Sequence, residues 1–160
     1  SITYRKNKIY YLWWVVIMGN GKYSAIELAD KIVSIANDND LTISNLQLQK
    51  VLYYVQGTFM RLYGKKAFNN KIECWPYGPV VREVWHHFNN YGRFPIYNIR
   101  SNLSITNDEY SLILNILKEK LNMNVWDLVD ATHDEIPWKN ANNNENKYIS
   151  DKDMELFFCK

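Results

Sequence analysis

Three histidines and a short acidic run are the first candidates for chemistry in this chain of 160 residues. His86 and His87 are adjacent, so on a helix their side chains point about 100° apart and do not easily share one metal ion. His133 lies in the stretch DATHDEIPW. A hydrolase that uses His133, Asp130 and Glu135 is one hypothesis. The alternative is that His133 ends a helix, where a positive charge is favourable, and the lack of any metal-ligand spacing favours it.

Other catalytic motifs are missing from the sequence. It contains no GxSxG and no glycine-rich phosphate loop. Its two cysteines, Cys74 and Cys159, are far apart and match no zinc spacing, which favours a reducing cytosol. Cys74 stands beside a tryptophan and is interpreted as a small core residue. These absences favour a binding protein over an enzyme.

The composition is that of one globular domain. Hydrophobic residues make up 47% of the chain and charged residues 22%, which is enough apolar material for a core. The net charge is only +2, and the basic residues are scattered. A nucleic-acid-binding protein would carry a clustered basic stripe, so no specific nucleic acid is predicted as a partner.

The first 22 residues differ from the rest. Their apolar run, Ile9 to Met18, is too short to span a bilayer, and no small-residue cleavage site follows it. We therefore interpret residues 1–22 as a leader or an extra strand, and place the domain at residues 23–160. No membrane association is predicted. A homodimer through the aromatic N-terminus is a further hypothesis.

The domain is predicted to be mainly α. Ser24, Ser44 and Thr106 each open a capping-box pattern, and Ser150 caps a last helix. The second helix carries an apolar face broad enough for burial on more than one side. That face consists of Leu48, Val51, Leu52, Val55, Phe59 and Leu62. The expected architecture is a compact single domain of about six helices, with a short strand or β-hairpin beside the stretch WPYGP.

The stretch ECWPYGPVVREVW, residues 73–85, is the most unusual part of the chain. It places Trp, Pro, Tyr, Gly and Pro in consecutive positions, and we call Trp75–Val80 the corner. Pro79 is predicted to be the first residue of a helix, where its missing N–H is not needed. Gly57, inside the second helix, is predicted to permit close approach of another element, and the corner at Trp75 is the expected partner.

Several motifs together resemble the Panacea domain, the family of SocA-like antitoxins often carried by phages and mobile elements. The pattern LxLQKLLYxxQ corresponds to Leu46–Gln56, and AWxYGPV to the corner, with Cys74 in place of the usual alanine. LTHxxxPW corresponds to residues 131–138, with Ala131 in place of leucine. The resemblance extends over residues 23–158 in the same order.

The resemblance implies a mainly helical, non-enzymatic, cytoplasmic protein in a bacterial or phage-infected cell, with no metal and no organic cofactor. Its implied function is that of an antitoxin, which neutralises a cognate toxin protein by direct binding. The alternative is a proteolytic adaptor or phage-encoded regulator that delivers a partner protein to a ClpXP-type protease.

The corner and its neighbouring motif supply the candidate partner-binding residues. Trp and Tyr are enriched at binding hot spots, and the two proline rings limit the entropy that the corner can lose on binding. The predicted residues are Trp75, Tyr77, Pro79, Arg82, Glu83, His133 and Trp138. For Trp75 the alternative is packing beneath the second helix near Gly57. Tyr77, Arg82 and Glu83 are expected to be exposed.

Overall fold

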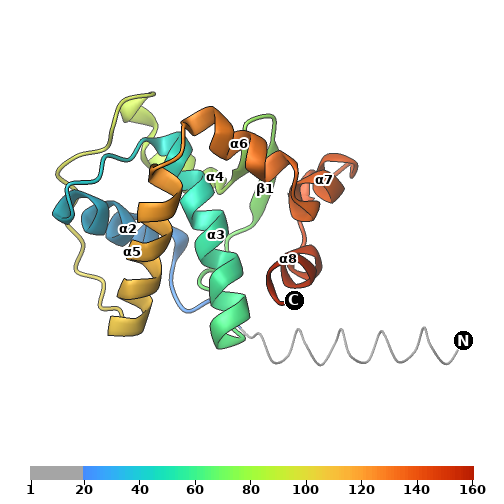
Figure 1. The fold of residues 1–160 in the computed structure, drawn as a ribbon, viewed down its shortest axis with the longest axis horizontal. Coiled ribbons are helices and arrows are strands. Elements are labelled where there is room, and N and C mark those ends of the chain that lie inside the picture. Colours follow the sequence, from blue (N-terminus) through green and yellow to red (C-terminus); the bar gives the residue numbers. More distant parts are fainter. Residues whose placement is uncertain (1–19) are drawn as a thin grey trace, which may run out of the picture.

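Helix α3 (Asn45–Tyr63) runs through the middle of the fold, and the other elements are arranged around it (Figure 1). The computed structural model describes residues 20–160. The leader or extra strand predicted for residues 1–22 falls almost entirely outside that range, at residues 1–19. The proposed dimer contact through the aromatic N-terminus lies there as well.

Helices dominate the described residues. The longer ones besides α3 are α2 (Ala25–Asp38), α5 (Asn107–Leu121) and α6 (Val125–His133). The shorter ones are α4 (Arg82–His87), the 3-10 turn η1 (Asn89–Tyr91), α7 (Ile136–Asn142) and α8 (Asp151–Phe158). Helix α3 packs against α2, α4, α5, α6 and α8. The seven α-helices of residues 20–160 confirm the mainly α class.

The capping residues define the helix starts as predicted. Ser44 and Thr106 form complete capping boxes with Gln47 and Glu109, in which each side chain bonds the backbone N–H of the other residue. At Ser24 only half of the predicted box forms: its hydroxyl accepts from the N–H of Glu27, and in residues 20–160 the Glu27 side chain makes no bond back to the Ser24 N–H. Ser150 caps α8 in the same way. Each bond satisfies an N–H that the helix itself leaves unpaired.

The central helix is buried on all sides over much of its length. Every residue from 48 to 57 is buried, which confirms the predicted broad apolar face. The exception is Leu62, which is 54% exposed near the end of the helix. Two polar residues within the buried stretch, Gln49 and Lys50, are fully buried with their apolar neighbours.

The predicted hairpin is part of a small antiparallel sheet with the strand order β2-β1-β3. The strands are β1 (Ile72–Trp75), β2 (Gly78–Val80) and β3 (Tyr148–Ile149). The prediction that Pro79 begins a helix is wrong. Pro79 lies in β2 opposite Cys74, and α4 starts three residues later. Proline is tolerated there because β2 is an edge strand.

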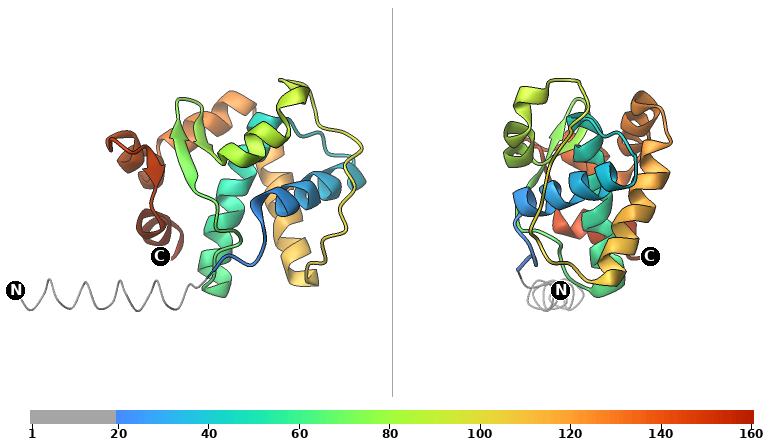
Figure 2. Two further views of the ribbon diagram at one scale, coloured as in Figure 1. Left: turned by 180° about the vertical axis from the view of Figure 1, so that it is seen from behind. Right: turned by 90° about the vertical axis from the view of Figure 1, so that its left-hand side faces the viewer.

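The C-terminal part holds two elements that the sequence did not indicate. The proline at position 137 suggests that the stretch EIPW is not helical, but only Glu135 is extended, as the residue that precedes the helix. Helix α7 then begins at Ile136 with Pro137 in its first turn, where a missing N–H costs nothing. Strand β3 follows and pairs with β1. Figure 2 shows this part of the chain beside the hairpin.

Gly57 is a point of close approach, as predicted, but the partner is not the corner. A side chain at this position would collide with the ring of Phe158 from α8. The same ring packs edge-on against Tyr53 and Tyr54 at centroid distances of 5.4 and 6.2 Å. Gly57 therefore provides the space in which the last helix docks on the central one.

Replacing Gly57 with alanine is expected to destabilise the protein. Overpacking against Phe158 costs about 1–3 kcal/mol, which outweighs the gain in helix propensity of up to about 1 kcal/mol. Urea denaturation followed by circular dichroism measures the change. In a Phe158→Ala background the same replacement should become neutral or stabilising, and an equal loss in both backgrounds would contradict this explanation.

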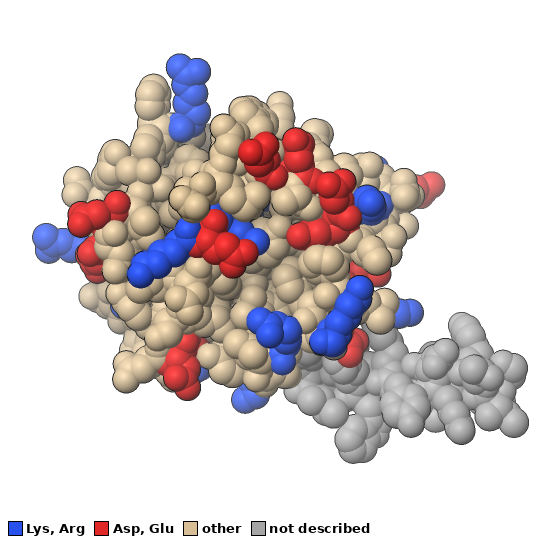
Figure 3. Space-filling view, viewed as in Figure 1, with Lys and Arg blue, Asp and Glu red and all other residues tan. Residues whose placement is uncertain are grey.

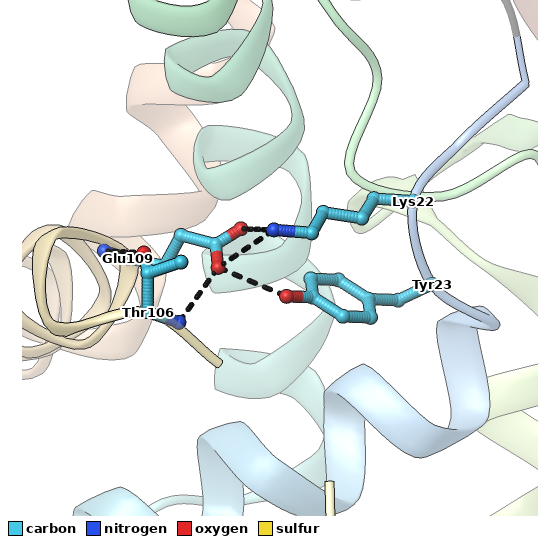
Figure 4. A network of polar contacts seen from close by, with 4 residues as sticks. All are labelled: Lys22, Tyr23, Thr106 and Glu109. Carbon is cyan, nitrogen blue, oxygen red and sulfur yellow. Dashed lines mark hydrogen bonds and ion pairs between the residues drawn. The ribbon is translucent and has the colours of Figure 1, made fainter. Parts of the chain in front are cut away.

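A buried carboxylate ties the segment before α2 to the start of α5 (Figure 4). Glu109 accepts from Lys22 Nζ at 3.1 Å, from the Tyr23 hydroxyl at 2.9 Å and from the Thr106 N–H at 2.9 Å. Burial by itself would raise the pKa of Glu109, but the bonds from Thr106, Tyr23 and Lys22 together lower it below the usual range. The carboxylate therefore stays charged at neutral pH.

None of the helices in residues 20–160 combines the length and the apolar character that crossing a membrane requires.

Candidate functional site

The corner is the tip of the β1–β2 hairpin, where the chain turns at Pro76 and Tyr77. Gly78 follows with φ at +102°, a conformation that favours glycine. A Cβ atom on Gly78 would lie 2.7 Å from Lys50 Cε and 2.7 Å from Thr132 Oγ1. The turn therefore fits between α3 and α6 only because position 78 has no side chain.

Buried polar side chains of α3 hold the second half of the corner. Lys50 Nζ donates to the carbonyl oxygen of Pro79 at 3.0 Å. Burial lowers the pKa of Lys50 to about 7. Gln49 Oε1 accepts from the Val81 N–H at 2.9 Å. The backbone from Pro79 to Val81 is thus fixed to the most deeply buried part of the fold.

The same network continues to helix α4. Gln49 Nε2 donates to Asn45 Oδ1 at 2.9 Å, and Asn45 Nδ2 donates to the carbonyl oxygen of Trp85 at 3.0 Å. All these donors and acceptors are partnered, as buried polar groups require. Hydrogen bonds therefore fix both ends of the segment 79–85 to α3.

Helices α6 and α7 hold the first half of the corner. Trp138 Nε1 donates to the carbonyl oxygen of Trp75 at 3.0 Å. His133, the last residue of α6, stacks on the Trp138 ring with centroids 4.0 Å apart. The predicted position of His133 at a helix end is confirmed. Trp138 therefore contacts the corner directly, and His133, which is also only partly exposed, packs on Trp138.

Trp75 is half-buried and packs against α4 rather than Gly57. Its ring meets the Trp85 ring edge-on at 5.7 Å, and the Arg82 guanidinium lies 5.7 Å from its centroid. Arg82 also forms a two-point ion pair with Glu73, at 2.7 and 2.8 Å. Arg82 is exposed as expected, but its charge is already paired. Glu83 is exposed beside it.

Among the predicted aromatic residues, Tyr77 lies at the tip of the turn, with 53% of its surface exposed. Its ring lies 6.3 Å from that of Trp126, which comes from the first turn of α6 and is 55% exposed. Trp126 was not predicted. Its position off the apolar stripe of Leu128, Val129 and Thr132 is the signal that could have identified it as exposed.

Glu135 was proposed as a catalytic group, but its neighbours give it a different role. Its two carboxylate oxygens accept from the hydroxyls of Tyr53 and Tyr54, each at 2.9 Å. Burial raises the pKa of Glu135, and the two tyrosine bonds oppose that rise in part. In residues 20–160 no hydrogen bond joins Glu135 or Asp130 to His133. Nor do three His, Cys, Asp or Glu side chains of those residues converge as a metal site would require.

The family profile described as "Antitoxin SocA-like, Panacea domain" matches residues 48–139. This range contains the Gln49–Lys50 pair, the corner and Thr132–Trp138, so it includes the three segments that meet in space. Antitoxin SocA of Caulobacter vibrioides is 42% identical to the chain over 53 residues, which are 33% of this chain and 28% of SocA. The chain therefore matches less than a third of that relative's length. No solved structure matches it.

Proposed function

The chain belongs to the SocA-like antitoxin family defined by the Panacea domain, and from this premise we propose that it neutralises a cognate toxin protein by binding it directly. The domain proposed for this role is residues 23–160, and the proposed location is the bacterial cytoplasm.

The observation that carries the proposal is an exposed aromatic residue on a fixed backbone. Tyr77 projects from a turn whose following residues are bonded to Lys50 and Gln49 in the core. Ordering a flexible loop on binding lowers affinity, and a fixed turn avoids that loss. Tyrosine is also among the residues that dominate binding energy at interfaces. The corner therefore has the properties of a preformed binding surface.

The predicted site residues divide by exposure into two proposed roles. Tyr77 and Glu83 face solvent and are proposed to contact the toxin, with Arg82 beside them. The others are less exposed and are proposed to hold the contact residues in position. These are Trp75, Pro79, His133 and Trp138.

The direct test is growth of cells that express the adjacent reading frame from an inducible promoter, with and without this chain. We expect the neighbouring product to stop growth, and this chain to restore growth and to purify with it. Tyr77→Ala should weaken both rescue and co-purification about tenfold or more. Phe94→Ala is the matched control, because Phe94 is an aromatic outside the corner and is 65% exposed.

The outcomes separate the two modes of neutralisation. Rescue at constant toxin level, with a stable complex, supports inhibition by binding. Rescue that requires a ClpXP-type protease and lowers the toxin level would assign the chain to the proteolytic adaptors instead. A neighbouring product that is not toxic, or that this chain does not counteract, would reject the antitoxin proposal for this pair.

A further inference from the structure

Two exposed aromatic rings from different elements lie side by side at one end of the molecule. Tyr77 comes from the hairpin turn and Trp126 from the start of α6, and their centroids are 6.3 Å apart. Each side chain keeps more than half of its surface exposed, at 53% and 55%. Trp and Tyr are the residues most enriched at binding hot spots, and here two of them meet in one exposed cluster.

The same face of α6 carries a stripe of acidic residues. Asp127, Asp130 and Asp134 follow Trp126 at helical spacing, which places them on one side of the helix. All three are exposed, and within residues 20–160 none of their carboxylates has a hydrogen-bond or ion-pair partner. Figure 3 shows acidic side chains gathered over this helix. We call Tyr77, Trp126, Asp127, Asp130 and Asp134 the aromatic–acidic surface.

We propose that the aromatic–acidic surface binds the toxin, and that the toxin presents to it a cationic segment with Arg or Lys side chains. This proposal rests on the proposed antitoxin function. The two rings supply apolar anchors, and the unpaired carboxylates supply a field that attracts positive charge and orients the approaching partner. An Arg side chain suits both features, because its guanidinium stacks on aromatic faces and pairs with carboxylates.

Charge argues against the other occupants of this surface. In a symmetric dimer the same patch lies on both partners, so two acidic stripes would face each other. A nucleic acid would bring phosphates against the carboxylates, whereas nucleic-acid binding depends on cationic side chains. A cationic protein surface is the partner whose charge complements the stripe.

Two sets of substitutions separate the contribution of the two aromatic rings from that of the three aspartate charges. The anchor variant is Tyr77→Ala with Trp126→Ala, and its control is Phe94→Ala with Tyr97→Ala, a second pair of exposed aromatics. The charge variant carries Asp127→Asn, Asp130→Asn and Asp134→Asn. Its control carries Asp38→Asn, Asp40→Asn and Glu145→Gln, which removes the same charge from exposed positions away from α6.

The measurement is binding of each variant to the purified product of the adjacent reading frame, by surface plasmon resonance at several salt concentrations. We expect the anchor variant to bind about 30-fold more weakly or worse. The charge variant should associate about tenfold more slowly at low salt and lose most of its salt dependence. Both control variants should bind as the unmodified chain does, and circular dichroism should be the same for all.

The possible failures can be told apart. If the unmodified chain binds the toxin and both variants bind equally well, the surface proposal is overturned while the antitoxin function stands. If the unmodified chain does not bind, both proposals fail together. If the unmodified chain is a dimer in light scattering and the anchor variant a monomer, the surface serves self-association and the proposal is likewise overturned.

Discussion

Replacing Gly78 with alanine is expected to destabilise the protein by about 3 kcal/mol. Its φ of +102° costs any other L-residue about 1–2 kcal/mol. The new Cβ would also lie 2.7 Å from Lys50 Cε and from Thr132 Oγ1, and such overpacking costs about 1–3 kcal/mol more. Neither neighbour can easily withdraw, because Lys50 is bonded to Pro79 and Thr132 to Val129. Urea denaturation measures the loss.

Gly64 provides the matched control. It also has a positive φ, +61°, but a Cβ there would meet nothing within 4 Å. Gly64→Ala should therefore show the backbone cost alone, about 1 kcal/mol. If Gly78→Ala cost no more than Gly64→Ala, the contact with Lys50 and Thr132 would not matter, and the corner would be less tightly held than its distances indicate.

The Gly78 variant also bears on function, because Tyr77 is the preceding residue. A shift of the turn would move the Tyr77 ring away from Trp126, while the acidic stripe on α6 would stay in place. In the proposed complex, Gly78→Ala should then weaken toxin binding in the same direction as the anchor substitutions. Its salt dependence should remain, because the carboxylates are unchanged.

Most of the helices, though not α7, could be predicted from the sequence because their signals are local. A hydroxyl at Ser44 or Thr106 and a partner three residues later are enough to define a helix start. Pro79 shows the limit of such signals. A proline after glycine suits the start of a helix as well as an edge strand, and pairing with β1 together with the bond from Lys50 selects the strand. Those contacts come from residues distant in sequence.

Some residues of the candidate site could be predicted from the sequence and others could not. Tyr77 was expected to be exposed and is, because a tight turn leaves its tip in solvent. Trp126 was missed, since nothing near it in the sequence indicates that α6 starts beside the corner. The contact between Gly57 and Phe158 joins positions about a hundred residues apart. A glycine can reveal that something approaches closely, but only the fold determines which element does.

The pH dependence of stability should reveal the buried amine of Lys50. Burial lowers the pKa of Lys50 to about 7 in the folded protein from its ordinary value of 10.5. Between these two values the unfolded chain holds a proton that the folded chain lacks. The free energy of unfolding therefore rises with pH in this range, by at most about 1.4 kcal/mol per pH unit. Below about pH 7 both states are protonated, and the full cost of burying the charge is present.

The difference between the unmodified chain and Lys50→Met isolates this effect, because every other titrating group is common to both proteins. Methionine has a similar length and does not titrate, so it fills the space without the proton. From pH 7 to 9.5 we expect the stability of the unmodified chain to rise by roughly 3 kcal/mol relative to the variant, as measured in urea. Tyrosines of the unfolded chain ionise only near pH 10, above this range.

Parallel curves for the two proteins would mean that Lys50 keeps its charge when buried, and that the bond to Pro79 is made by an ammonium rather than an amine. A stability difference that rises with pH would instead show that Lys50 is a neutral amine in the folded protein, because it is buried between α3 and the hairpin.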